Sequence, residues 1–291
     1  MHSYLKAIGF HLSNRQEEEN LIRQVIEQAE EKQIYEENGI RFAEIRLEIA
    51  EDVGLVVRGE YDEKDEFHVE HYFPYLRGKN VSTQEEVFVS KRVDTEAFTA
   101  MCDDFRLGVS LIFYLQNAVD YMKIREFCGD EPMYHPITLA GLALRGKILL
   151  PIKKDKNMEK IMSSDVAHRT YLISEAKKGN QKAIEDLTLD DIDMYTMVSR
   201  RIQQEDVYSI VDTTFIPYGS ESDNYTVLGI IQNVKTVENK MTKEEIYILQ
   251  LCCNQMEFEV CINKKDLLGE PLPGRRFRGI VWMQGNVDFN A

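Results

Sequence analysis

Short segments in which apolar and polar residues alternate recur along most of the chain, and this period of two constrains the fold more than any other feature. The clearest case runs from Ala43 to Ile49, where every second residue is apolar and the residues between are charged. Successive side chains of a strand point to opposite faces, so such a segment predicts a half-buried strand. Further strands are predicted at residues 53–61, 67–75, 86–93 and 107–115.

Helices are predicted at three places among these strands. Residues 13–38 carry apolar residues at spacings of three and four, with Asn38-Gly39 as a C-terminal cap. Shorter helices are predicted at 94–104 and 117–127. Strands and helices in this order predict an α+β domain over residues 1–152, with an antiparallel sheet and helices packed on one face.

The segment from Gly141 to Lys147 has the spacing of a phosphate-binding loop, two glycines with a lysine after the second. Ile148 stands where such a loop has Ser or Thr for Mg²⁺, and the flanking residues are apolar like those of a strand. A phosphate-binding loop instead needs free backbone N–H groups opening a helix. We therefore predict a hairpin over residues 137–152, with Gly146 at its turn.

From residue 153 the apolar period becomes helical. Helices are predicted at 167–178, 181–187 and 188–201, with Gly179 ending the first and Asn180 capping the second. The chain thus has a predicted helical connector over residues 153–205.

The C-terminal part, residues 206–291, returns to the period of strands. Five short strands with one small helical element at 264–268 suggest a small β-barrel, most economically an OB-like one. A plain β-sandwich or meander is the alternative. The strands are predicted at 207–216, 225–237, 245–254, 257–263 and 275–282.

Composition excludes several classes of protein. Lysine and arginine number 35 against 50 aspartate and glutamate residues, and the net charge of −15 argues against a protein that coats nucleic acid or an anionic membrane. No run approaches the roughly 20 apolar residues that span a bilayer. Met1 to Phe10 lacks the pattern of a signal peptide. Five cysteines are too few for a disulfide scaffold. We expect a cytoplasmic protein.

Candidate metal ligands do not converge. His68 and Glu70 share one face of a predicted strand, whereas His71 lies on the other. The cysteines lack the C-x-x-C spacing of a zinc site, so we interpret them as small core residues. Four aspartates are interpreted as caps at a helix start. We expect neither a metal nor a cofactor. The aspartates are Asp186, Asp190, Asp191 and Asp193, and the cysteines are Cys252, Cys253 and Cys261.

The last predicted strand carries the candidate ligand-binding residues. Arg276, Arg278, Trp282 and Gln284 share one face of it. Two guanidiniums, the only tryptophan and an amide on one strand face can stack on and bridge to a planar or anionic ligand.

The same residues also fit a purely structural role, which is the favoured interpretation. Glu257 and Glu259 alternate outward on the preceding strand and could pair with Arg276 and Arg278 across it. Trp282 would then seal the barrel against the first domain.

Four segments resemble an uncharacterised clostridial family of similar length, and the likeness spans the whole chain. The resemblance implies a cytoplasmic bacterial protein from an anaerobe. It brings no activity, ligand or functional residue with it. The segments are MHSYLKAIGF at 1–10, VSLIFYLQN at 109–117, AIEDLTLDDID at 183–193 and GRRFRG at 274–279.

Three hypotheses follow for the function. The leading one is a non-enzymatic interaction or scaffold protein, which binds a protein partner or a second copy of itself. The first alternative is a module that binds a small or oligomeric anionic ligand on the barrel face, and we do not expect nucleic acid or a membrane as its partner. The second alternative is an enzyme with scattered residues between the domains, since no nucleophile motif such as G-x-S-x-G occurs.

Overall fold

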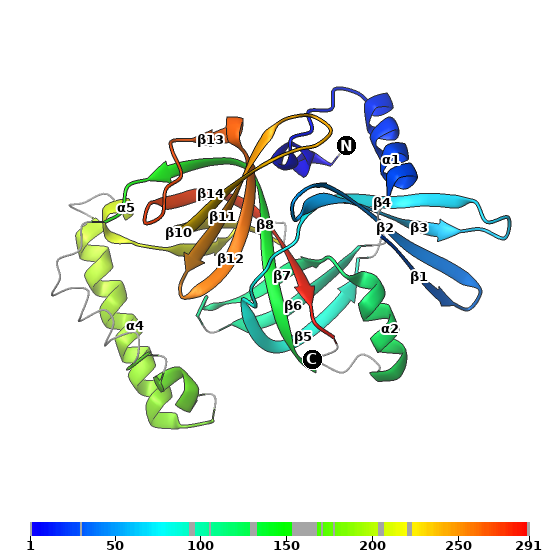
Figure 1. Ribbon diagram of the computed structural model, residues 1–291. Coiled ribbons are helices and arrows are strands. Elements are labelled where there is room, and N and C mark those ends of the chain that lie inside the picture. The colour runs from blue at the N-terminus through cyan, green and yellow to red at the C-terminus, as the bar shows by residue number, and fades with distance from the viewer. Residues whose placement is uncertain are drawn as a thin grey trace. The chain divides into compact units, whose positions relative to one another are not determined.

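The computed structural model combines sheets with fewer helices, which confirms the α+β class (Figure 1). The chain divides into two compact units, residues 1–149 together with 213–291, and residues 150–212. The structure describes residues 2–29, 31–92, 97–104, 106–128, 133–152, 168–169, 171–176, 178–202, 207–219 and 223–289.

The N-terminal part of the first unit is an antiparallel sheet in the order β1-β2-β3-β4, as predicted. The predicted helix over 13–38 is wrong beyond Gln28, because residues 31–37 pair with the next strand. Asn38 and Gly39 both have positive φ and form the hairpin turn, for which Asn-Gly is the preferred pair. The elements are η1 (Ser3–Ile8), α1 (Arg15–Gln28), β1 (Glu31–Glu37), β2 (Ile40–Ala50), β3 (Val53–Tyr61) and β4 (Phe67–Leu76).

The remaining strands of this unit join into one ten-stranded sheet. Residues 98–104 of the predicted helix at 94–104 are a strand, whereas 93–96 lie outside the described residues. The elements are β5 (Thr83–Lys91), β6 (Phe98–Asp104), β7 (Val109–Leu115), α2 (Ala118–Cys128), β8 (Met133–Leu149), β9 (Thr214–Pro217), β10 (Asn224–Glu238), β11 (Glu245–Cys253), β12 (Met256–Asn263), η2 (Lys264–Asp266), β13 (Leu267–Leu268) and β14 (Arg276–Val287).

The pairings of this sheet close into two rings that share β8 and β14. One ring runs β10-β11-β12-β8-β14 and back to β10. The other runs β5-β6-β7-β14-β8 and back to β5. In each ring the third strand of an antiparallel meander pairs in parallel with the long strand of the other half. The two halves, β5-β6-β7-α2-β8 and β10-β11-β12-η2-β14, therefore have the same topology, although the sequence shows no repeat.

The predicted hairpin over 137–152 is wrong, because β8 is a single strand that pairs with β14 along its length. Gly146 is not a turn residue: a Cβ at this position would lie 2.4 Å from the ring of Phe277. Gly141 is similar, since its Cβ would lie 2.2 Å from Val281 Cγ1. These glycines admit large side chains of β14 against the backbone of β8.

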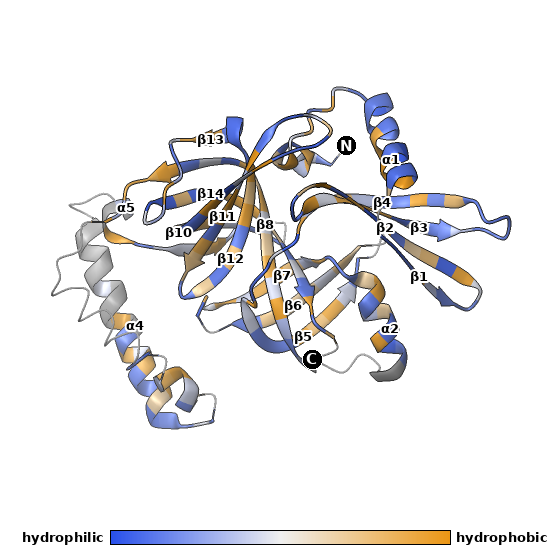
Figure 2. Ribbon diagram, viewed as in Figure 1, coloured by the Kyte–Doolittle hydropathy of each residue, from blue (hydrophilic) through white to orange (hydrophobic). Residues whose placement is uncertain are grey.

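Two hydrophobic clusters lie on opposite sides of these strands, in keeping with the alternating colours along them (Figure 2). The first contains Phe113, Leu251 and Phe277 from both rings. The second contains Trp282 of β14 together with residues of η1, α1 and the four-stranded sheet. Cys253 and Cys261 are buried in these clusters, as the core interpretation predicts, whereas Cys252 is only partly buried.

The second unit contains helix α4 (Gln181–Ile202), a helical stretch at 171–176 and helix α5 (Val207–Ile210). Asn180 caps α4 as predicted, its side chain accepting from the backbone N–H of Lys182 at 3.1 Å. The helix continues through residue 188, so the four predicted capping aspartates lie within it and that interpretation is wrong. Residues 207–210 are helical and only 214–217 of the predicted strand 207–216 pair in the sheet.

The predicted domains over residues 1–152 and 206–291, with a helical segment at 153–205, stay a prediction, and residues 1–149 and 213–291 form one compact unit. The strands before and after this unit enter the same sheet, because β8 pairs with both β12 and β14. Residues 153–167 of the predicted connector lie outside the described residues.

The charged face of β2, predicted to point outward, is buried as well. Glu44 accepts from Arg46 and from Arg58 Nε, the latter at 2.9 Å, and the side chains of Glu44 and Arg58 are 0% exposed. Arg58 Nη2 also donates to the backbone carbonyls of Leu115 and Gln116. Burial alone would raise the pKa of Glu44, but the two guanidiniums hold it below its usual range. The cluster joins the four-stranded sheet to the end of β7.

We expect Glu44→Gln to lower the free energy of unfolding by about 3–5 kcal/mol, because it leaves two buried guanidiniums without their counter-charge. Urea unfolding at pH 7 measures this. Glu36→Gln, at an exposed position of β1, is the control and should change stability by less than about 0.5 kcal/mol. Equal effects of the two substitutions would contradict the assignment.

Candidate functional site

Three of the four predicted site residues, Arg276, Trp282 and Gln284, are buried in the interior. Gln284 Nε2 donates to the carbonyl of Pro74 at 2.8 Å, and its Oε1 accepts from Gln116 Nε2 at 2.8 Å. Trp282 is 5% exposed. Gln284 therefore ties β14 to β4 and to the segment after β7, a structural role.

The two arginines lie toward the start of β14. Arg276 is buried and Arg278 partly so. β14 pairs with β7, β8 and β10, whereas Glu257 and Glu259 lie on β12, which pairs with β11 and β8. The predicted cross-strand pairing of these glutamates with the arginines is therefore wrong. Binding of an anionic ligand at Arg276 and Arg278 stays a prediction.

Aromatic rings from distant parts of the chain surround Trp282. Its ring centroid lies 4.9 Å from that of His2 and 5.2 Å from that of Tyr4. On the other side it lies 5.1 Å from that of Tyr114 in an edge-to-face arrangement. Trp282 therefore packs against the N-terminal segment, whereas its role in sealing a barrel against the first domain stays a prediction. We call this group the Trp282 cluster, with the members His2, Tyr4, His71, Tyr72, Tyr114 and Trp282.

Most polar atoms of the Trp282 cluster are paired. Trp282 Nε1 donates to Asp223 Oδ2 at 3.0 Å, and Arg92 forms an ion pair with the same carboxylate. Tyr4 Oη donates to Asn224 Oδ1 at 2.6 Å. These bonds fix the rings that lie nearest to β14.

Two imidazole nitrogens of the cluster are exceptions. His2 Nδ1 and His71 Nε2 are buried and have no hydrogen-bond partner among the described residues. Burial lowers the pKa of His71 to about 4, and the guanidiniums of Arg58 and Arg92 act in the same direction. Burial likewise lowers the pKa of His2 to about 4, with the neighbouring His71 as the next cause. Both imidazoles are therefore neutral near pH 7.

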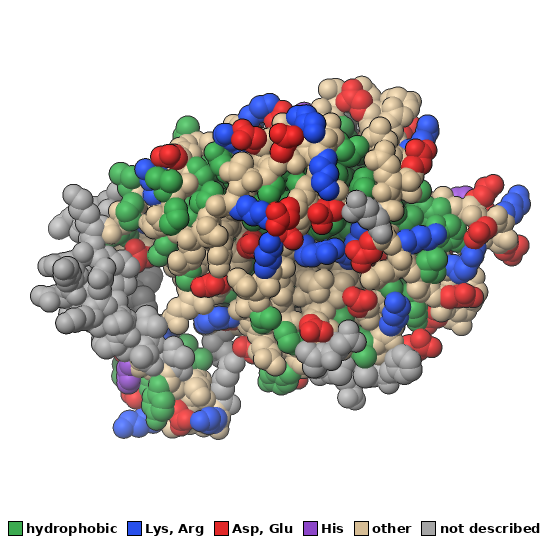
Figure 3. All heavy atoms as spheres, viewed as in Figure 1, with side chains coloured by type: hydrophobic (Ala, Val, Ile, Leu, Met, Phe, Trp, Pro, Cys, Tyr) green, Lys and Arg blue, Asp and Glu red, His purple; other side chains and the backbone are tan. Residues whose placement is uncertain are grey.

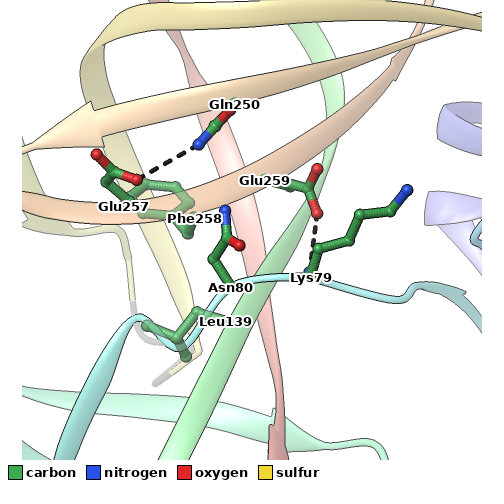
Figure 4. A pocket seen from close by; sticks show the side chains of 7 residues that line it. All are labelled: Lys79, Asn80, Leu139, Gln250, Glu257, Phe258 and Glu259. Carbon is green, nitrogen blue, oxygen red and sulfur yellow. Dashed lines mark hydrogen bonds between the residues drawn. The ribbon is translucent and has the colours of Figure 1, made fainter.

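A separate shallow surface hollow lies where β11 and β12 face the segment after β4 (Figure 4). Gln250 Nε2 donates to Glu257 Oε2 at 3.3 Å across its upper side. Glu259 Oε2 accepts from the backbone N–H of Lys79 at 3.1 Å. The lining residues are Lys79, Asn80, Leu139, Gln250, Glu257, Phe258 and Glu259.

The hollow is acidic because its one lysine points elsewhere. Lys79 Nζ lies 2.7 Å from Asp52 Oδ2 and 3.6 Å from Glu51 Oε1, and Figure 4 shows its chain directed away from the hollow. Among the described residues, neither Glu257 nor Glu259 forms an ion pair. Burial raises the pKa of Glu259. The arrangement therefore suits a positively charged group.

A group of possible metal ligands that the sequence does not predict lies around His68. Asp62, Glu66 and His68 have ligand atoms within 4.8 Å of one another at the β3–β4 turn. His68 Nε2 lies 3.1 Å from Asp62 Oδ2, and the His68 side chain is 62% exposed. Exposed groups of this kind at a turn carry no assignment of a metal.

Little in the sequence points to the Trp282 cluster or to the acidic hollow. Trp282 was singled out as the only tryptophan, but His2 and Tyr4 lie about 280 positions earlier in the chain. Lys79 and Asn80 follow β4 in a segment without a recognisable motif. No helix among the described residues is long and apolar enough to cross a membrane.

The lowered pKa values of His2 and His71 predict how the free energy of unfolding depends on pH. Their pKa values lie near 4 in the folded protein against the ordinary 6.5, so the unfolded chain binds more protons in this window. Their contribution is fully present above pH 6.5 and is lost as pH falls to about 4, on the order of 3 kcal/mol for each imidazole.

We expect His71→Phe to flatten the fall in unfolding free energy between pH 6.5 and 4.5, measured by urea unfolding with Trp282 fluorescence. His68→Phe, at the exposed histidine of the same strand, should keep the wild-type slope. Parallel curves for wild type and His71→Phe would show that His71 is not the titrating group.

Comparison with known proteins identifies the family of the chain but assigns it no activity. No curated protein and no solved structure matches the chain. A family model described as "Domain of unknown function, E. rectale Gene description (DUF3881)" matches residues 5–285, nearly the full length. This confirms the resemblance to a clostridial family of unknown function. The chain belongs to the DUF3881 family.

Proposed function

We propose that the protein is a non-enzymatic, cytoplasmic interaction protein whose acidic hollow binds a lysine or arginine side chain of a basic protein partner. The hollow presents two carboxylates, Glu257 and Glu259, next to the amides of Asn80 and Gln250 (Figure 4). Ammonium and guanidinium groups donate several hydrogen bonds and accept none, so a lining of carboxylate and amide oxygens complements them.

The observation that carries the proposal is that neither carboxylate forms an ion pair with any of the described residues. Glu259 is partly desolvated and accepts a backbone N–H from Lys79, whose ammonium group is paired with Asp52. A partly buried carboxylate without a cation is unfavourable, and a cationic side chain of a partner would relieve this. The net charge of −15 would attract such a partner over longer distances.

We further propose that each ring of five strands is an OB-like barrel. In support, each ring consists of a three-stranded meander closed by β8 and β14. OB folds bind ligands on the face of their second and third strands, and in one ring these are β11 and β12, which carry the hollow.

The acidic lining argues against nucleic acid as the occupant of this face. Figure 3 also shows acidic and basic side chains interspersed over the face in view, without a continuous basic patch among the described residues there. A phosphate backbone would meet Glu257 and Glu259 and be repelled.

We expect a fluorescent octalysine peptide to bind the protein, as measured by anisotropy at low ionic strength. The double variant Glu257→Gln/Glu259→Gln should weaken binding at least tenfold, a difference of about 1.4 kcal/mol. An octaglutamate peptide should not bind.

The control removes the same charge from another place. Glu36→Gln/Glu37→Gln changes two exposed glutamates of β1 and should leave the dissociation constant within about twofold. Equal weakening by both double variants would mean that net charge alone attracts the peptide, and it would refute a site at the hollow.

A further inference from the structure

We propose that the Trp282 cluster binds a small, neutral, planar heteroaromatic molecule with hydrogen-bonding edges, such as a nucleoside base. This site is independent of the acidic hollow. It draws its residues from η1, β4, β7 and β14, whereas the hollow lies on β11, β12 and the segment after β4.

The first observation is that the cluster is aromatic and partly exposed. Trp282 and Tyr114 are buried, whereas His2, Tyr4, His71 and Tyr72 are each partly exposed. His2 and Tyr72 lie 6.3 Å apart between ring centroids, and His71 lies 6.1 Å from Tyr114. Aromatic side chains of this kind offer faces and edges on which a planar ring can stack.

The second observation is the contrast between paired and unpaired polar atoms. The hydroxyl of Tyr72 accepts from the backbone N–H of His2 at 2.9 Å and donates to Glu18. The indole of Trp282 is likewise paired with Asp223. Only His2 Nδ1 and His71 Nε2 are buried without a partner in this cluster, and buried polar atoms rarely stay so without a functional reason.

The charge state of the imidazoles selects the class of ligand. Both are neutral near pH 7, so each offers one donor and one acceptor rather than a positive charge. An anion gains little from them. A transition metal would need further ligands, and the described group of three ligating side chains, which includes His68, lies at the β3–β4 turn instead. A neutral ligand with paired donors and acceptors fits best.

The only tryptophan gives a direct measurement, because it lies 4.9 Å from His2 between ring centroids. We expect saturable changes of Trp282 fluorescence on titration with at least one of adenosine, guanosine, cytidine and uridine at pH 7. In His71→Phe, the dissociation constant should rise at least tenfold. In His68→Phe, on the same strand but exposed, it should be unchanged.

Two further variants keep the test decisive. If His71→Phe unfolds, His2→Phe removes the other unpaired nitrogen and should weaken binding in the same way. Glu257→Gln/Glu259→Gln should leave the nucleoside response intact, so failure of one site is distinguishable from failure of the other. The proposal is overturned if no nucleoside gives a saturable change, if the histidine variants respond like wild type, or if Zn²⁺ alone produces the response.

Discussion

The antiparallel pair of β8 and β14 is the interaction on which the rest of the first unit depends. Both five-stranded rings close through it, because the first and last strands of each meander pair with β8 or β14. Four glycines make the pair possible, because a Cβ at any of them would lie within 3 Å of a packed side chain such as Phe277, Val281 or Phe113. They are Gly141, Gly146, Gly279 and Gly285.

The shared pair also explains why the halves cannot be separate domains in the usual sense. β8 pairs with β5 of its own half and with β12 of the other half. β14 pairs with β10 of its own half and with β7 of the other half. A chain arranged in this way buries one common cluster on the side of Phe113, Leu251 and Phe277. The opposite side of β14 remains for the N-terminal elements, which cover Trp282 and Gln284. The Trp282 cluster is thus a product of the ring closure.

Alternation along the sequence predicted most strands but not their neighbours. It located the strands near residues 225–237, 245–254 and 257–263 within one or two positions, because a period of two depends only on which face is buried. It could not show that β12 pairs in parallel with β8, which lies more than a hundred residues earlier. Gly146 predicts a turn although it lies within β8, because close packing and turns select glycine equally.

The prediction also failed where charges are buried or where the ring partners lie far apart in sequence. Alternation predicts that Glu44 and Arg46 face solvent. They are buried because Glu44 forms ion pairs with both Arg46 and Arg58, and Arg58 lies on another strand. The candidate site was predicted in part: Trp282 was identified, whereas His2 and His71 acquire their significance from contacts that no local pattern encodes.

Hydrogen exchange of the native protein tests the central claim, that the shared pair makes both rings one cooperative unit, most directly. The account predicts that amides of β8 and β14 exchange last. It also predicts that amides of β5–β7 exchange with the same free energy of opening as those of β10–β12. If the amides of residues 83–115 instead exchanged with a much lower free energy than those of 224–263, the two rings would open separately and the claim would be wrong.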